Sequence, residues 1–285
     1  MNNLKTVGLL TLMTALVWWL GLLLFGGVEG MVIGLLFAVV LNFLAYFFSA
    51  KMALAMSRAK PVAEHELPKV YGMIRRLAAS SDMPMPSIHL IDSPQPNAFA
   101  TGRNPKHAAV AVTTGILQVM RDDELEGVLA HELSHVRNRD ILISSIAAMM
   151  AAALTIFSRI AFWFGGGGRD RNNPAGLVIA LAAMILAPIA GMIIKMAISR
   201  AREYQADRSG AEMTGQPLSL ARALDKIGTA SGRIPMEVNP AVSQLFIADP
   251  LKAFGRRRGG GGGLFSTHPP IEERIRRLEE MYYRT

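Results

Sequence analysis

Four long apolar blocks constrain the fold of this chain more than any other feature. They run from about Val7 to Phe25, from Met31 to Phe48, from Ile141 to Phe157 and from Ala175 to Ile194. A helix needs about 20 apolar residues to cross the hydrocarbon core of a bilayer. Each block is close to that length, so the sequence predicts a multi-pass membrane protein of mainly α-helical class.

Composition supports a membrane setting and excludes several other classes of protein. Hydrophobic residues make up 51% of the 285 residues and charged residues only 18%, which is less charge than a soluble domain usually carries. There is no cysteine, so a disulfide scaffold, a thiol nucleophile and a cysteine-ligated metal are excluded. The net charge of +8, beside apolar spans, favours a lipid bilayer over nucleic acid as the partner.

The apolar blocks divide the chain into four parts. We expect two transmembrane helices in residues 1–50 and a transmembrane hairpin in residues 141–198, with polar segments at 51–140 and 199–285. Basic residues cluster where both polar segments leave the apolar blocks, which predicts that these segments face the cytoplasm. These basic residues are Lys51, Arg58, Lys60, Lys195, Arg200, Arg202 and Arg208.

Within the polar segments, apolar spacing predicts a small sheet between helices. Strands are expected at about 87–91, 97–101 and 107–112, and helices at about 66–79, 195–213, 218–227 and 270–281. A further helix should end at Arg137, with Asp122 or Asp123 as its N-cap and Glu126 as the partner in a capping box.

The clearest chemical signal lies in that last helix, in the run His131-Glu132-Leu133-Ser134-His135. Residues i and i+4 share one face of a helix, so the two imidazoles are predicted to bind one zinc ion. Glu132 is offset by about 100°, beside the metal rather than on it. There its carboxylate can take a proton from a water that the metal activates.

A catalytic zinc takes three protein ligands and leaves one position open. Without cysteine, the third ligand must be His, Asp or Glu. Glu203 and Asp207 are the best candidates, because they lie i and i+4 on one helix. Glu203 is predicted to bind the metal, and Asp207 to accept a hydrogen bond from a ligating histidine. On spacing alone, an ordinary solvated helix explains these two carboxylates equally well.

The expected hairpin favours the metal-site interpretation of Glu203 and Asp207 over the solvated helix. His135 lies about one turn before the third apolar block, and Glu203 about two turns after the fourth. Arg169 and Arg171 leave open whether the hairpin crosses the bilayer fully, but in either case its two ends emerge on the same side. Glu203 is therefore expected near the histidine pair, close to the membrane surface.

Several motifs together resemble the membrane zinc metalloproteases of the HtpX family, which are heat-shock-linked bacterial enzymes related to the prenyl-protein zinc endoproteases of eukaryotes. The motifs are HELSH, EYQAD, PNAFATG (Pro96 to Gly102), VTTGIL (Val112 to Leu117) and STHPP with a downstream RI (Ser266 to Ile275). The resemblance extends over essentially the whole chain, including the order of the apolar blocks.

This resemblance implies a gluzincin-like α+β metalloprotease domain that carries a small β-sheet. It implies one Zn²⁺ per chain, bound by His131, His135 and Glu203, with Glu132 as the general base. The implied location is a bacterial inner membrane, with the protease domain facing the cytoplasm. The implied activity is stress-response quality control, in which misfolded or damaged membrane proteins are cut.

Two further residues are candidates for the site. His268, in the run THPP, is a candidate catalytic residue that stabilises the oxyanion; the alternative is a loop histidine before the last helix. Asn97 begins an expected strand; if this strand is an edge beside the zinc, substrate can add to it and Asn97 can bind the substrate backbone. A structural turn asparagine is equally plausible. His65, His89 and His107 have no partner at ligand spacing and are expected to be surface or sheet residues.

The alternative function is a membrane scaffold or chaperone with a structural zinc. Structural zinc sites usually have four protein ligands and need no carboxylate at the position of Glu132. A metal transporter is less favoured, because it needs ionisable residues inside its spans and the four blocks contain almost none. The sequence specifies neither a particular substrate nor an oligomeric state.

Overall fold

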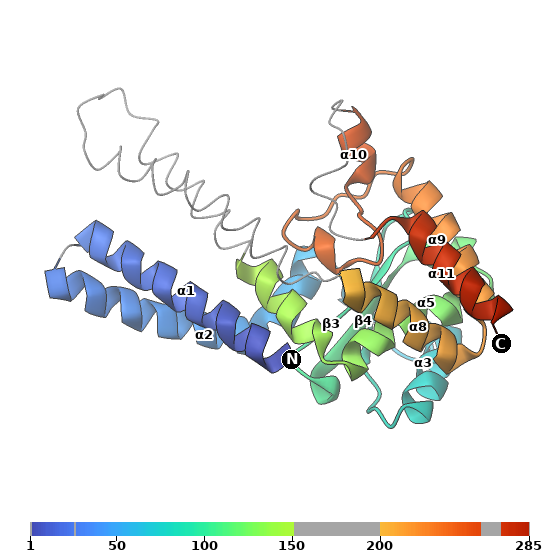
Figure 1. Ribbon diagram of the computed structural model, residues 1–285, viewed down its shortest axis with the longest axis horizontal. Helices are drawn as coiled ribbons and strands as arrows, with labels where there is room; N and C mark the ends of the chain where they lie inside the picture. The colour runs from blue at the N-terminus through green and yellow to red at the C-terminus, as the bar shows by residue number, and fades with distance from the viewer. Residues whose placement is uncertain (1, 26, 151–199, 258–268, 285) are drawn as a thin grey trace.

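The computed structural model describes residues 2–25, 27–150, 200–257 and 269–284, and in these it is mainly helical with one small sheet (Figure 1). The helices are α1 (Asn2–Phe25), α2 (Gly27–Met56), α3 (Pro68–Ser80), α4 (Thr114–Val119), α5 (Asp122–Arg137), α8 (Arg200–Thr214), α9 (Pro217–Ser231), α10 (Lys252–Arg257) and α11 (Ile271–Tyr283), with 3-10 turns η1 (Pro105–His107) and η2 (Ser243–Leu245). A further apolar helix spans Asp140–Met150. The strands are β1 (Lys60–Pro61), β2 (Ser87–Ile91), β3 (Ala98–Gly102) and β4 (Ala108–Thr113).

Helices α1 and α2 form a hairpin that projects from the rest of the molecule (Figure 1). Glycines allow the two helices to approach closely, since a Cβ at Gly21 would lie 2.7 Å from the Cα of Gly34. Asn42 of α2 donates a hydrogen bond to the Thr14 hydroxyl of α1 at 2.7 Å, an interaction typical of packed membrane helices.

Among the described residues, α2 is the helix long and apolar enough to cross a membrane, with 30 residues and a mean hydropathy of 2.4 over its most apolar window. Large apolar side chains on its outer surface, such as Phe37 and Phe43, are more than half exposed. α1 and α2 cover the first two predicted apolar blocks. The third block is described only to Met150, and the fourth lies outside the described residues.

The sheet has the strand order β1-β2-β4-β3 and contains both parallel and antiparallel pairs. β2 runs parallel to β4, with Ser87 opposite Ala109, and β3 runs antiparallel to β4, with Ala98 opposite Val112. All six residues of β4 are buried, which explains its continuous apolar sequence. The three predicted strands are therefore confirmed to within one residue, and β3 lies at the edge of the sheet.

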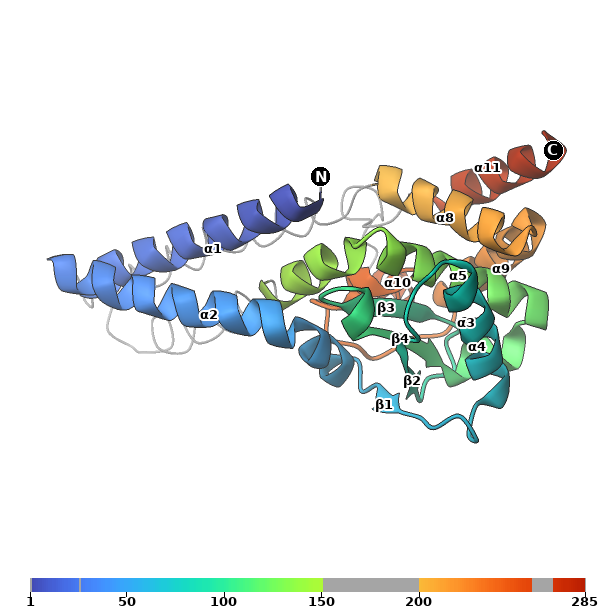
Figure 2. The ribbon, with the colours of Figure 1, turned by 90° about the horizontal axis from the view of Figure 1, so that it is seen from below.

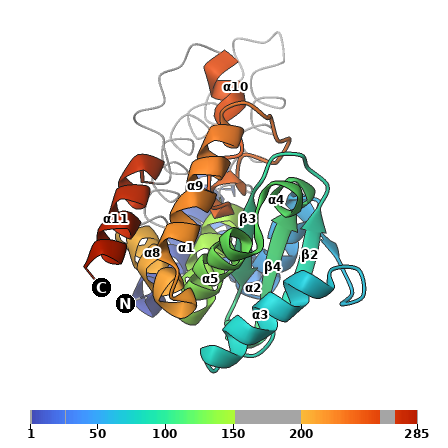
Figure 3. The same ribbon diagram turned by 90° about the vertical axis from the view of Figure 1, so that its right-hand side faces the viewer.

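Helix α5 lies at the centre of the layered domain. It sits between the sheet on one side and α8 and α9 on the other, with α11 beyond them (Figures 2 and 3). Apolar residues of the sheet, α5 and α9 meet in one core, including Val110, Leu129 and Leu224, which are completely buried. Because α5 is covered on both sides, most of its residues are buried, including the polar His131 and Glu132, whereas His135 is partly exposed.

The predicted N-cap of α5 is wrong by one residue. The helix begins at Asp122, and Arg121 is its N-cap. Glu124, rather than Glu126, reaches back and accepts a hydrogen bond from the backbone N–H of Arg121 at 2.9 Å, whereas Glu126 accepts one from Arg76 of α3. Consecutive acids in the first turn all suit the helix dipole, so local sequence could not decide which of them is the cap.

Candidate metal centre

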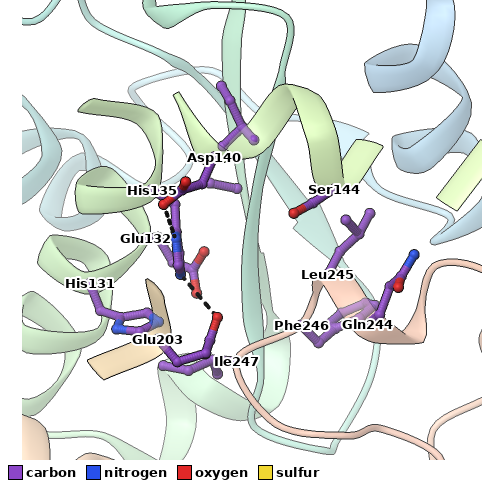
Figure 4. Close-up of a pocket in the computed structure, with 12 residues that line it drawn as sticks. His131, Glu132, His135, Asp140, Ser144, Glu203, Gln244, Leu245, Phe246 and Ile247 are labelled. Atoms are coloured by element: carbon purple, nitrogen blue, oxygen red, sulfur yellow. Dashed lines mark hydrogen bonds and ion pairs between the residues drawn. The ribbon is translucent and has the colours of Figure 1, made fainter. Parts of the chain in front are cut away.

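Two histidines and one remote carboxylate meet where α5 crosses α8. The rings of His131 and His135 lie on one face of α5, with centroids 4.9 Å apart. α8 approaches this face through Gly210, where a Cβ would lie 2.8 Å from the backbone nitrogen of His131. Glu203, two turns earlier on α8, therefore points at the histidines, and its Oε1 lies 3.5 Å from His135 Nε2 (Figure 4).

The geometry of these three side chains fits a zinc ion. One potential ligand atom from each of His131, His135 and Glu203 lies within 4.8 Å of the other two. Tetrahedral zinc with bonds of about 2.1 Å holds its ligand atoms about 3.4 Å apart, close to the observed separation of His135 and Glu203. Two imidazoles and a carboxylate form the donor set of catalytic zinc sites that keep one position open.

Each histidine has a carboxylate behind its ring. The Nδ1 of His131 lies 3.0 Å from Asp207 Oδ1, and the Nδ1 of His135 lies 3.3 Å from Asp140 Oδ2. Contacts of this kind fix the tautomer and the orientation of ligating imidazoles. Asp207 is the residue for which the sequence suggested this role. Asp140, at the start of the next helix, was not anticipated.

Arg274 of α11 is a further site residue that the sequence did not identify. Its side chain is completely buried, and its Nε and Nη2 donate to the two oxygens of Asp207 at 2.8 and 2.7 Å. A third hydrogen bond joins its Nη1 to the carbonyl oxygen of Ile247. Two signals were available: Arg274 is the arginine of the RI motif, and it lies on the same helical face as the apolar residues Ile271 and Leu278.

Burial and neighbouring charges shift the pKa values of the site. Burial raises the pKa of Glu132 to about 7, against the opposing charge of His135. Burial by itself lowers the pKa of His135, but the hydrogen bond with Asp140 and the charges of Glu203 and Glu132 outweigh it and raise this pKa to about 9. A general base with a pKa near 7 suits proton transfer at neutral pH.

The same effects act on the other histidine and its partner. Burial lowers the pKa of His131 below its ordinary value, despite the contact with Asp207. Burial raises the pKa of Asp207, but the charge and hydrogen bonds of Arg274 outweigh burial and lower this pKa to about 2. In the metal-free site, His131 is therefore neutral and Asp207 ionised at pH 7.

The three candidate metal ligands open into a small cleft. Its walls come from the edge strand β3, from the helix that starts at Asp140 and from the chain segment 244–247. The open space of about 40 Å³ can hold a metal ion with a water molecule. The lining residues are Ala100, His131, Glu132, His135, Asp140, Ile141, Ser144, Glu203, Gln244, Leu245, Phe246 and Ile247 (Figure 4).

Asn97 does not take part in this cleft, which corrects the expectation that it binds substrate. It is completely buried, and its Nδ2 donates to the carbonyl oxygen of Ala248 at 2.9 Å. Its Oδ1 accepts hydrogen bonds from the backbone N–H groups of Ala98 and Ala248. The amide therefore holds the segment at Ala248 against β3 and has no group free for a substrate.

The other histidines lie away from the metal centre. His65 and His107 are exposed, and His89 is buried in β2, where burial lowers its pKa. These positions agree with the expected surface or sheet roles. His268 lies outside the described residues, so its proposed contact with the oxyanion stays a prediction.

Comparison with known proteins gives concordant results. The sequence model of peptidase family M48 matches residues 64–282. A protease HtpX homolog of Burkholderia ambifaria is 51% identical over 284 residues, covering 98% of this chain and 97% of the relative. One of Syntrophobacter fumaroxidans is 49% identical, covering 98% and 99%.

A solved structure has a similar fold. The crystal structure of S. mikatae Ste24p matches with a TM-score of 0.53 at 20% identity. The match covers 98% of this chain but 65% of the Ste24p chain, so this chain spans about two thirds of the length of that protein.

Proposed function

The chain belongs to peptidase family M48 and is a membrane-associated metalloprotease, and from this premise we propose that it is a zinc-dependent endopeptidase of misfolded or damaged membrane proteins. The observation that carries this proposal is the convergence of His131, His135 and Glu203 around a cleft into which Glu132 also opens. We place the protein in a bacterial inner membrane, where residues 51–140 and 199–285 form a cytoplasmic protease domain and residues 141–198 a transmembrane hairpin.

The side chains of this site are arranged for peptide hydrolysis. A zinc ion bound by His131, His135 and Glu203 would polarise the scissile carbonyl and acidify water. The pKa of Glu132 is about 7 in the metal-free site, and the charge of a bound zinc ion would lower it. The buried carboxylate is therefore ionised at neutral pH and takes the proton of the attacking water. Glu132 then passes this proton to the leaving amine, so no covalent intermediate with the protein is needed.

The test separates zinc binding from proton transfer. Glu132→Gln should keep the zinc content of the wild type and lose cleavage of a membrane-protein substrate, whereas Glu203→Ala should lose zinc. Glu126→Gln is a matched control, because Glu126 lies on the same helix but contacts Arg76 instead of the cleft. Cleavage by Glu132→Gln at the wild-type rate would show that the mechanism is wrong.

The same experiment addresses the alternative of a membrane scaffold or chaperone with a structural zinc. If the zinc is structural, removing it should destabilise the protein. The wild type should then have no peptidase activity, so Glu132→Gln should abolish none. Zinc-loaded wild-type protein that cuts no peptide bond under any condition, while losing its fold on chelation, would favour that alternative.

A further inference from the structure

One wall of the cleft carries a polar atom that no described residue satisfies. The side chain of Gln244 is 6% exposed, and it lines the same cleft as His131 and Glu132. Its Oε1 is buried without a hydrogen-bond partner. A buried carbonyl oxygen without a partner lowers stability, so its place in the wall of this cleft points to a partner that arrives with the ligand. Because this oxygen is closed to water in the free protein, the side chain must turn toward the cleft when the ligand binds.

The direction of this carboxamide is set by its neighbour. The Nε2 of Gln244 donates to the carbonyl oxygen of Ala241 at 3.4 Å. Rotating the amide by 180° would bring two carbonyl oxygens together, so the end that faces Ala241 must be the NH₂ group. The unpartnered end is therefore an acceptor, and the group that it fits is an N–H or O–H donor.

The segment that holds Gln244 is fixed to the edge strand. The ring of Phe246 packs on Phe99 of β3 with centroids 4.9 Å apart, and the backbone N–H of Ile247 donates to the carbonyl oxygen of Ala98 at 3.0 Å. Val242 and Phe246 are completely buried. The backbone of Gln244 consequently has a fixed position relative to β3, as a specificity group requires.

An extended peptide supplies the donor that this acceptor lacks. Each peptide unit that enters the cleft loses water from its N–H and needs an acceptor in return. The apolar neighbours Leu245 and Ile141 in the cleft wall offer none. We propose that Gln244 is a substrate-binding residue whose Oε1 accepts a main-chain N–H of the peptide, the role that Asn97 cannot fill. This inference rests on the proposed endopeptidase function.

The experiment measures peptide binding without turnover. A fluorescein-labelled decapeptide, with one central phenylalanine in an alanine background, is titrated into zinc-loaded Glu132→Gln protein, followed by ten derivatives that each carry one N-methyl group. In this background one N-methyl position should weaken binding about tenfold, because it removes the donor. When Gln244→Met is added, the parent peptide should bind about tenfold more weakly, and that N-methyl position should no longer matter.

Controls distinguish this contact from a general loss of structure. Gln244→Ala should reproduce the Gln244→Met result, and both should keep the zinc content of the parent. Gln118→Met, at an exposed position of α4 outside the cleft, should leave all eleven affinities unchanged. The inference is overturned if every N-methyl position has the same effect with and without Gln244. If the parent peptide fails to bind the zinc-loaded Glu132→Gln protein at all, the endopeptidase proposal fails, and the role of Gln244 fails with it.

Discussion

Two rows of charged side chains lie behind the histidines of the candidate metal centre, and each row consists of a carboxylate followed by an arginine. In the first, His131 contacts Asp207 and Asp207 is paired with Arg274. In the second, His135 contacts Asp140, whose Oδ1 lies 3.7 Å from Nη1 of Arg202. Each carboxylate thus faces a histidine on one side and an arginine on the other, and for Asp207 the close arginine holds the pKa low in a buried setting. The surroundings of the two histidines also differ: burial lowers the pKa of His131, whereas the carboxylates of Asp140, Glu203 and Glu132 raise the pKa of His135.

The first prediction at this scale concerns His135. Because its pKa is raised to about 9 in the metal-free site, it carries a proton at pH 7 that zinc must displace. Zinc uptake at pH 7 should therefore release about one proton from His135, and zinc affinity should fall as the pH drops below about 9. Titration calorimetry in buffers of different ionisation enthalpy measures the released protons.

Asp140→Asn provides the control for this prediction. The substitution removes the charge and weakens the hydrogen bond that hold the pKa of His135 high, so fewer protons should be released at pH 7. Zinc uptake by the wild type at pH 7 without proton release would contradict the expected state of His135.

The second prediction concerns Asp207. Asp207→Asn should lower zinc affinity about 10- to 100-fold, as is usual when the partner of a ligating histidine is changed. It should also destabilise the fold by about 3–5 kcal/mol, because the buried Arg274 loses its close partner and keeps only the longer ion pair with Glu203 at 3.8 Å. Competition with a zinc chelator and thermal unfolding measure the two effects. Since the pKa of Asp207 is lowered to about 2, its contribution to stability is present at pH 7 and disappears as the pH falls from about 4 toward 2.

A double variant separates the two roles of Asp207. Asp207→Asn combined with Arg274→Met removes both buried charges, so stability should recover in part while zinc affinity stays low. If zinc affinity recovered together with stability, Asp207 would act on the fold alone and not on His131.

At the scale of elements, the contact between α5 and α8 decides whether the site exists. The two helices come from parts of the chain that are more than 60 residues apart, and Gly210 allows α8 to lie directly against the backbone of His131. A larger residue there must push α8 outward, together with Glu203. The position of Glu203 therefore depends on how closely α8 packs against α5.

This gives a prediction for Gly210→Ala. The added Cβ would lie 2.8 Å from the backbone nitrogen of His131, a clash that only a shift of α8 can relieve. We expect a loss of stability of about 1–3 kcal/mol and weaker zinc binding, because Glu203 moves away from the histidines. Gly72→Ala on α3 is the matched control, since a Cβ there would meet only the flexible side chain of Arg76, at 3.8 Å. That variant should be neutral or stabilising, and equal effects of both variants would contradict the role of Gly210.

The same scale shows what the sequence can predict. α3 and β2 follow from local apolar spacing, and the HExxH helix α5 from its motif, because each depends on neighbours within a few residues. The segment after α9 cannot be predicted in this way, because its conformation depends on hydrogen bonds with residues that are distant in the sequence. Gln95, for example, donates to the carbonyl oxygens of Ile234 and Pro250. Local periodicity carries no record of such contacts.

The residues of the candidate site also fall into two groups, those that local sequence predicts and those that it does not. His131, Glu132 and His135 are visible in the sequence as a local motif, and Glu203 and Asp207 through their spacing on a second helix. Arg274 and Gln244 are not visible in this way, because their importance comes only from the groups that folding brings beside them. Asn97 is the opposite case: it belongs to a characteristic motif, but its side chain holds the segment at Ala248 against β3.

At the scale of the whole molecule, basic and aromatic side chains lie together where the sheet meets α2. The guanidinium of Arg103, in the turn after β3, lies 5.2 Å from the ring of Phe47 on α2. Lys51 lies over Phe48 on the same helix. No acidic residue occurs in 43–60 or 98–107. A basic rim beside lipid-exposed aromatic rings is suited to the headgroup layer.

This arrangement predicts the depth of the turn after β3. The chain has no cysteine, so Lys106→Cys and Asp225→Cys each provide a single labelling site, and both positions are exposed. In proteoliposomes, a fluorophore at 106 should be quenched by lipids with nitroxide-labelled headgroups, whereas one at 225, on α9, should not. Equal quenching at the two positions would contradict the predicted orientation of the domain.

The guanidinium that anchors Asp207 comes from α11, the last helix described in the chain. During translation, the ribosome completes the histidine pair and Glu203 well before it reaches Arg274. Until then, Asp207 has no buried cation to balance it, and His131 has no fixed support. We therefore expect the candidate metal centre to gain its full support only after synthesis has passed α11.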